Sequence, residues 1–237
     1  MIGWRLEQYP ELGSTSDEIV RRAKAGEPAG LAVLALRQTA GRGSRGRAWT
    51  APEGNLNLSI LLRPTRPTEA AGLFSLIAGI AVLEALESLH ARHLSLKWPN
   101  DILCSGAKLA GILIDAMPDG PRLDWLAIGI GVNLKTAPDI PGRRTADLAA
   151  QGLHIAPDEA AHAFLARLAP WLDAPAAEIR AAWLAKAHPL GTPMEIAYTG
   201  HRQSGHFAGL SEHGELLLQC ENRIETLNTG EVLLANG

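Results

Sequence analysis

A run of alternating glycines and arginines at residues 41–49 (GRGSRGRAW) is the part of this chain best suited to chemistry. Glycine costs backbone entropy in helices and strands alike, so this run predicts a loop that bends sharply or lets a ligand touch its backbone. Three guanidiniums on one loop repel one another unless an anion lies among them, and the planar fork of arginine suits phosphate and carboxylate groups. We therefore expect a loop that binds an anionic ligand, is mobile while its arginines are unpaired, and becomes ordered when the ligand binds.

Two blocks that each begin with a lysine follow at residues 97–101 (KWPND) and 108–113 (KLAGIL). Asp101 is a candidate ligand for a Mg²⁺ ion, since Mg²⁺ takes one or two protein carboxylates, keeps several waters and usually binds substrate phosphates. Asn100 places a donor and an acceptor beside it. Read singly, Pro-Asn-Asp is an ordinary turn and Lys108 is a solvated lysine at the start of a strand. Their close succession favours one joint site.

The common nucleotide-binding fingerprints do not account for the glycines. Gly41, Gly43 and Gly46 formally match the G-x-G-x-x-G pattern, but no helical pattern opens after Gly46 and the chain is broken at Pro52 instead. The chain has no GKS or GKT sequence, which excludes a P-loop.

The composition is that of an ordinary globular protein, with 46% hydrophobic and 20% charged residues among 237. A net charge of −3 argues against a general nucleic-acid binder. The two cysteines, Cys104 and Cys220, are far apart and are expected to be reduced thiols of a cytoplasmic protein. The N-terminus lacks the plan of a signal peptide. The longest apolar run, residues 73–86, is interrupted by Ser75 and Glu84, so we expect no membrane span.

Helical and strand patterns alternate along the first 187 residues. Helices are predicted at residues 15–25, after a capping box that begins at Thr15, and at residues 68–90, 157–172 and 175–187. The helix at residues 68–90 is expected to be amphipathic. Strands are predicted at residues 31–37, 56–62, 94–98, 102–104, 108–116 and 123–134. Glycines 129 and 131 in the last strand mark close approach by a ligand or another backbone.

The pattern changes after Pro189 to short β segments with a tight turn at His213-Gly214. These segments are predicted at residues 194–198, 206–210, 215–219, 223–226 and 231–234. About fifty residues of short strands favour a small barrel.

The three blocks, together with Ser14-Thr15 and residues 129–133 (GIGVN), resemble the biotin protein ligase family, the biotin–[acetyl-CoA-carboxylase] ligases, over roughly residues 10–235. The resemblance implies an α/β (α+β) fold: a biotin/lipoate ligase-like catalytic domain at residues 1–187, with a mixed central sheet and helices, and an SH3-like β barrel at residues 188–237. Some members carry an N-terminal helix-turn-helix domain and act as repressors. The catalytic motifs begin too early here for such a domain, so no DNA binding is expected.

The resemblance also implies the reaction. Biotin is activated with ATP, accompanied by Mg²⁺, to biotinyl-5′-AMP, and is then transferred to a lysine of a biotin carboxyl carrier protein or carboxylase biotin domain. The substrates supply both nucleophiles, which fits a chain without a Ser-His-Asp or Cys-His set. A homodimer is compatible with the family.

The site residues follow from the same resemblance. Residues expected to bind biotin are Ser14, Thr15, Ser16, Gln38, Gly41, Arg42, Gly43, Ser44, Trp49, Lys108 and Gly111. Residues expected to bind ATP are Arg45, Gly46, Arg47, Trp49, Asn100, Asp101, Lys108 and Asn133. The catalytic group is expected to be Lys108, Asp101 and Arg45, with Asp101 as the candidate Mg²⁺ ligand. Many relatives have arginine where this chain has Ser44, and asparagine is common where it has Ser16.

Two other functions stay open at this point. A lipoate or octanoyl ligase shares the fold, although the KWPND and glycine-arginine blocks favour biotin. A non-catalytic biotin-binding regulatory protein has no use for phosphate-directed charge, so Lys108 and Asp101 argue against it.

Overall fold

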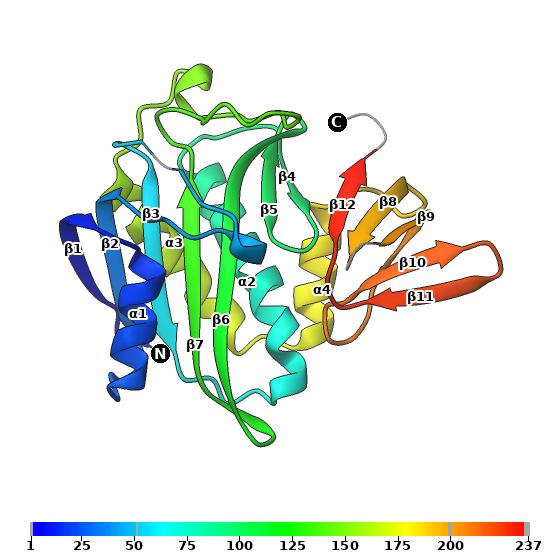
Figure 1. The fold of residues 1–237 in the computed structure, drawn as a ribbon, viewed down its shortest axis with the longest axis horizontal. Coiled ribbons are helices and arrows are strands. Elements are labelled where there is room, and N and C mark those ends of the chain that lie inside the picture. The colour runs from blue at the N-terminus through cyan, green and yellow to red at the C-terminus, as the bar shows by residue number, and fades with distance from the viewer. Residues whose placement is uncertain (1, 51, 199–200, 235–237) are drawn as a thin grey trace.

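The computed structural model describes residues 2–50, 52–198 and 201–234, which form two β sheets with four α helices (Figure 1). The large sheet has seven strands in the order β1-β2-β3-β7-β6-β5-β4, and the small sheet has five in the order β11-β10-β9-β8-β12. The predicted fold class is confirmed: a mixed sheet with helices is followed by a small antiparallel, barrel-like sheet.

The strands of the large sheet pair antiparallel except for β1 and β2, which are parallel. Their bounds are β1 Arg5–Leu12, β2 Leu31–Gln38, β3 Leu56–Leu62, β4 Leu94–Lys97, β5 Asp101–Cys104, β6 Ala107–Asp119 and β7 Arg122–Val132. The sequence patterns did not predict β1, because RLEQYPEL has no apolar alternation and contains a proline. Such a strand is tolerated at an edge, which is where β1 lies.

Helices cover both faces of this sheet. Their bounds are α1 Thr15–Lys24, α2 Ala71–Ser88, α3 Pro157–Leu172 and α4 Ala176–Ala185. Alternate strand residues point to opposite faces, so Leu58 and Ile60 pack in the cluster with α2 and α3, whereas Leu61 packs with Ile19 of α1.

The helix α2 is apolar nearly all round, so the expectation of an amphipathic helix was wrong. The sheet, α3 and α4 all pack on it (Figure 1), and a helix enclosed in this way needs no polar face. Together with the preceding 3₁₀ turn it forms a 21-residue stretch, Thr68–Ser88, that is long and apolar enough to cross a membrane. However, 72% of its apolar window is buried inside the protein, as in the core helix of a globular domain.

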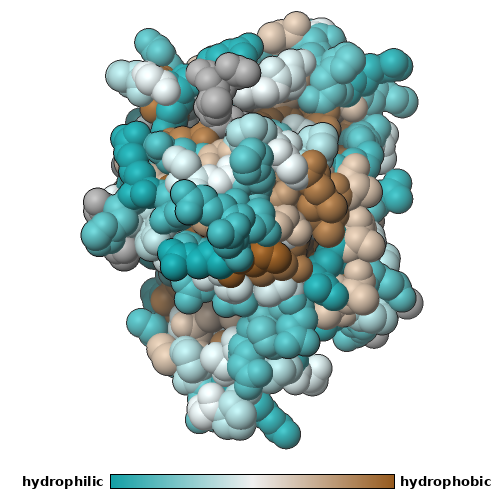
Figure 2. Space-filling view, turned by 90° about the vertical axis from the view of Figure 1, so that its right-hand side faces the viewer, coloured by the Kyte–Doolittle hydropathy of each residue, from teal (hydrophilic) through white to brown (hydrophobic). Residues whose placement is uncertain are grey.

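The small sheet packs against the edge of the large sheet formed by β4 and β5 (Figure 1). Its strands are β8 Pro193–Tyr198, β9 His201–Leu210, β10 Leu216–Cys220, β11 Arg223–Leu227 and β12 Glu231–Leu234. The Trp98 indole donates to the carbonyl of Gly214 (3.1 Å), and a Cβ added to Gly230 would lie 3.3 Å from the Trp98 ring. Hydrophilic side chains cover most of the face that this part of the chain presents in Figure 2.

Candidate active site

The glycine-arginine loop folds back on itself across the face of the large sheet (Figure 1). A 3₁₀ turn at Ser44–Gly46 reverses the chain, and the Trp49 amide donates to the carbonyl of Gly41 (2.9 Å). Gly41 has to be glycine, because a Cβ there would lie 2.4 Å from the Trp49 carbonyl oxygen. The reversal brings Trp49 over β6 and β7.

The Trp49 indole packs directly on two glycines of the large sheet. Gly111 of β6 and Gly131 of β7 are paired in register, and a Cβ added to Gly131 would lie 2.3 Å from the indole. Its Nε1 is buried without a hydrogen-bond partner among the described residues. The Lys108 ammonium lies 5.9 Å from the ring centroid, within range of a cation–π interaction. The strand glycines do mark close approach, but by side chains and not by a ligand or another backbone. Trp49 lies over Gly131, and a Cβ added to Gly129 would lie 2.5 Å from the Ser16 hydroxyl.

A network of buried polar groups lies on one side of Trp49. The Thr15 amide and hydroxyl both donate to Oε1 of Gln38 (2.7 and 3.1 Å), and the Gln38 amide donates to Oδ1 of Asn57 (3.2 Å). The Ser59 hydroxyl lies 2.8 Å from that of Thr15 and 3.2 Å from that of Ser16. The sequence analysis missed Asn57 and Ser59. The sign of their role is that both are polar residues in a strand that the structure shows to be wholly buried.

This network borders a small cavity of about 40 Å³. Its lining residues are Thr15, Ser16, Gln38, Arg42, Gly43, Ser44, Trp49, Asn100, Lys108, Gly111, Ile112, Leu113, Gly129, Ile130 and Gly131. All residues expected to bind biotin are among them except Ser14 and Gly41. Ser14 caps α1 by accepting from the Asp17 amide (3.3 Å), so the helix cap is Ser14 and not Thr15.

A large cavity of about 520 Å³ lies on the other side of Trp49. Its lining residues are Gly43, Ser44, Arg47, Ala48, Trp49, Thr50, Pro52, Lys108, Asn133, Pro138, Asp139, Ile140, Arg143 and Thr145. The two cavities share the loop, Trp49 and Lys108. Of the residues expected to bind ATP, Arg45, Gly46 and Asp101 line neither cavity, and Asn100 lines the small one.

Asn133 presents an unused acceptor at the large cavity. The side chain is 1% exposed, and its amide donates to the carbonyl of Ala146 (3.1 Å). Its Oδ1 is buried with no hydrogen-bond partner among the described residues. An unsatisfied buried acceptor is costly, so a ligand that brings a donor to Asn133 gains by pairing with it.

Lys108 and Asp101 form an ion pair between β6 and β5, with side chains 19% and 16% exposed. The adjoining corner is fixed on β6, since the Asn100 amide donates to the Ile112 carbonyl (2.6 Å) and the Ile112 amide donates to that of Asn100 (2.9 Å). Over the described ranges no three His, Cys, Asp or Glu side chains converge in a way that could hold a metal. A Mg²⁺ ion arriving on ATP phosphates needs only one protein carboxylate, and Asp101 can supply it in exchange for the Lys108 ammonium.

The arginines of the loop are all paired, so the expectation of unpaired guanidiniums was wrong. Arg45 and Arg47 contact the Glu231 carboxylate of β12 (3.2 and 3.1 Å), and Arg143 pairs with the same carboxylate. Arg42 pairs instead with Asp17 (2.9 Å) and Asp115 (3.1 Å). The carboxylates that the three loop guanidiniums require are supplied by the protein itself, from segments too distant in sequence for spacing to indicate them.

Burial raises the pKa of Glu231, but Arg143, Arg47 and Arg45 together outweigh burial and hold that pKa below its ordinary value. The carboxylate is therefore charged at neutral pH and joins the small sheet to the glycine-arginine loop.

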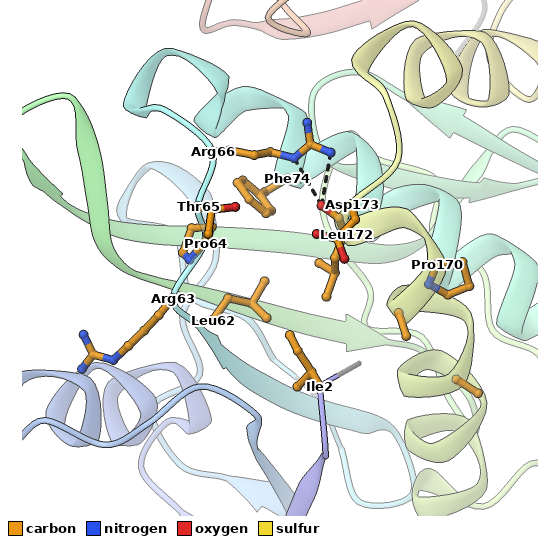
Figure 3. Close-up of a pocket in the computed structure, with 12 residues that line it drawn as sticks. Ile2, Leu62, Arg63, Pro64, Thr65, Arg66, Phe74, Pro170, Leu172 and Asp173 are labelled. Atoms are coloured by element: carbon orange, nitrogen blue, oxygen red, sulfur yellow. Dashed lines mark hydrogen bonds between the residues drawn. The ribbon is translucent and has the colours of Figure 1, made fainter.

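A separate pocket of about 560 Å³ lies between the end of β3 and the helices α2 and α3 (Figure 3). Leu62, Phe74 and Leu172 give it an apolar floor. Figure 3 shows the Arg66 guanidinium turned toward the end of α3, where it donates to the Leu172 carbonyl (3.3 and 3.1 Å). The Arg63 guanidinium is engaged by backbone carbonyls and Asp124. With both cations engaged in this way, the pocket does not resemble a phosphate site.

Comparison with known proteins agrees with this fold. Residues 14–133 match the biotin/lipoate A/B protein ligase family, and the chain belongs to that family. Residues 194–234 match the biotin protein ligase C terminal domain, which places the chain among the biotin protein ligases of that family.

Relatives agree along the length of the chain. It is 42% identical over 220 residues to a biotin–[acetyl-CoA-carboxylase] ligase of Paracoccus denitrificans, covering 84% of this chain and 88% of the relative. A biotin protein ligase from Aquifex aeolicus, solved with biotin and ATP, superposes with a TM-score of 0.81 at 30% identity, covering 96% and 97%. One from Leishmania major in complex with biotinyl-5-AMP gives 0.65 at 28% identity, covering 94% and 98%.

Proposed function

We propose that this protein is a biotin–[acetyl-CoA-carboxylase] ligase, which activates biotin with ATP and transfers it to a carrier lysine. The observation that carries the proposal is the junction at Lys108 and Trp49. There a small cavity, lined by the polar Thr15, Ser16 and Gln38 and by Arg42, meets a larger cavity lined by Arg47 and Arg143, and Lys108 lines both. A substrate with a neutral polar head and a carboxylate tail, and a second substrate with phosphates, fit these two sides.

The small cavity suits the ureido ring of biotin. The Thr15, Ser16 and Ser59 hydroxyls can each donate or accept, and the Gln38 amide does both. A ring with N–H donors and a carbonyl acceptor can replace the hydrogen bonds that these groups now make with one another. The biotin carboxylate then lies toward Lys108 and the large cavity.

Adenylation forms a bond between a biotin carboxylate oxygen and the α-phosphorus of ATP, and pyrophosphate leaves. Lys108 lies where this charge is redistributed, and Arg47 and Arg143 border the space for the remaining phosphates. The free Oδ1 of Asn133 suits the exocyclic amino group of adenine or a ribose hydroxyl. Catalysis on this model consists of positioning and charge stabilisation.

In the second step the amine of the carrier lysine attacks the carbonyl carbon of the mixed anhydride. An amide forms and AMP leaves with the bonding electron pair. We propose a biotin carboxyl carrier domain as the acceptor and the cytoplasm as the place of reaction, with no DNA or membrane partner. A homodimer is compatible with this proposal.

Binding of biotin requires movement of Trp49. A volume of about 40 Å³ is little more than one water molecule occupies, whereas biotin is a bicyclic molecule with a five-carbon acid chain. The indole fills the space over Gly111 and Gly131, so we propose that the described arrangement is closed and that biotin displaces the indole.

Exchange of label between pyrophosphate and ATP, measured with biotin and with lipoate, tests the function. We expect exchange with biotin and none with lipoate. Exchange with lipoate alone would identify a lipoate ligase. Tight biotin binding without exchange would identify a non-catalytic biotin-binding protein, and either result would refute the proposal.

A further inference from the structure

Lys97 is a half-buried cation beside the candidate site to which no role has yet been given. It is the last residue of β4 and lies directly opposite Asp101 in the antiparallel register of β4 and β5. Directly opposed residues have their side chains on the same face of a sheet, with Cβ atoms about 5 Å apart. Asp101 pairs with Lys108 on its other side. Three neighbouring strands thus present lysine, aspartate and lysine on the face that carries the site.

The surroundings of Lys97 are those of the large cavity. Its charge interacts with Asp101, Glu231, Lys108 and Arg143, of which Arg143 and Lys108 line that cavity. In the closed arrangement Lys97 itself lines neither cavity.

Lys97 also differs from the neighbouring cations in its pairing. Lys108 is held by Asp101, and Arg143 by Glu231. Within the described ranges, no carboxylate oxygen lies within ion-pair distance of the Lys97 ammonium, although the side chain is half-buried. Burial accordingly lowers the pKa of Lys97, although Asp101 and Glu231 act against that effect. An ammonium held in this way is stabilised when an anion reaches it.

The local charge leaves room for such an anion. Three carboxylates, those of Asp101, Glu231 and Asp139, lie among five cations, namely Lys97, Lys108, Arg45, Arg47 and Arg143. A triphosphate that enters the large cavity with its α-phosphate at Lys108 can extend toward Arg143 and the edge strand β4. Its outer two phosphates then come to Lys97.

We infer that Lys97 binds the outer phosphates of ATP and stabilises the pyrophosphate leaving group during adenylation. The inference rests on the proposed function. As the carboxylate oxygen bonds to the α-phosphorus, the bond from that phosphorus to the α–β bridging oxygen breaks. The electron pair of the broken bond stays on pyrophosphate, beside the Lys97 ammonium, and no proton is transferred. In the second half-reaction pyrophosphate takes no part, so Lys97 is needed in the first half-reaction alone.

The test separates the two half-reactions in Lys97→Met, which keeps the length of the side chain and removes its charge. We expect biotin-dependent ATP–pyrophosphate exchange to fall on the order of 100-fold, the usual cost of removing one charge-stabilising donor, with a raised KM for pyrophosphate. Transfer from chemically prepared biotinyl-5′-AMP to a purified biotin carboxyl carrier domain should stay within about twofold of the wild-type rate. Lys97→Arg should recover most of the exchange, because it restores the charge.

A matched control is Lys186→Met, since Lys186 lies on the segment beside β4 and pairs with Glu87 outside the site. It should leave both half-reactions unchanged. Equal losses in both half-reactions of Lys97→Met, or undiminished exchange, would overturn the inference and leave the ligase function standing. Wild-type protein without any biotin-dependent exchange would overturn both.

Discussion

The contact between Glu231 and the glycine-arginine loop predicts the behaviour of Glu231→Gln. This change removes the charge that Arg45, Arg47 and Arg143 share, while keeping the shape of the side chain. Three guanidiniums are then left around one neutral amide. We expect a less stable protein and a loop that opens more often.

The expected loss of stability in Glu231→Gln follows from how exposed Glu231 and its three arginine partners are. The Glu231 side chain is 23% exposed and those of the three arginines are 33–42% exposed, so water screens each pair. Partly exposed pairs contribute about 0.2–1 kcal/mol each, which gives about 1–2 kcal/mol for three pairs that share a carboxylate. In a chain of this length that corresponds to a fall in Tm of about 2–8 °C. Because the pKa of Glu231 is lowered in the folded protein, the difference is fully present above about pH 4.3 and disappears as the pH falls through the lowered pKa.

Thermal unfolding and hydrogen exchange over residues 41–48 measure the two effects. Glu195→Gln is the control, because Glu195 lies on the same small sheet and, among the residues that the structure describes, pairs only with Arg202, an arginine 70% exposed. It should change Tm by less than about 1 °C. If Glu231→Gln matched the wild type in both Tm and loop exchange, the ion pairs would not hold the loop and the reasoning would be refuted.

Four further outcomes are expected. Lys108→Ala should lower adenylation at least 100-fold and also lose stability by leaving Asp101 unpaired; wild-type turnover would exclude Lys108 from catalysis. Biotin should change the tryptophan fluorescence, and an equal change in Trp49→Phe would show that the indole does not move. Ser44→Arg should slow release of the adenylate about 10- to 100-fold through a charge-assisted hydrogen bond, and an unchanged rate would mean that another residue already makes that contact. Burial, and then Lys97, lowers the pKa of His188, so its contribution is present above about pH 6.5 and is lost as the pH falls. The Tm of His188→Gln should therefore fall less than that of the wild type between about pH 7.5 and 5.5, and an equal fall would contradict the assignment.

Much of the fold could be predicted because its elements follow local patterns. The strand at residues 56–62 and the helix at residues 157–172 have the bounds that their apolar spacing indicates. The strand β1 could not be found, since its charged residues and proline suit only an edge position. The enclosure of α2 depends on how the chain packs around it, and a run of apolar residues does not reveal on how many sides it is covered.

Within the site, sequence motifs predicted the residues that are close to one another in the chain or known from the family. Thr15, Gln38 and Lys108 come from separate motifs, and the structure brings them to one cavity. Ser59 was missed because a polar residue in an alternating strand reads as solvent-facing, whereas here α1 covers that face of the sheet. Glu231 was missed because ion pairs between distant segments leave no periodic signal. That these residues bind biotin and ATP stays a prediction.

The distance in sequence between Glu231 and the arginines has a consequence for how the protein acquires activity during folding. Arg45 and Glu231 are separated by 186 positions, so their contact can form only when segments from the two parts of the chain have met. Contacts of such long separation carry a high loop-closure entropy and form late. In a refolding experiment the large sheet can be complete, with its secondary structure regained, before the loop is held over the site. Biotin-dependent activity should then lag behind the recovery of circular dichroism, and the lag should have the rate at which the small sheet docks.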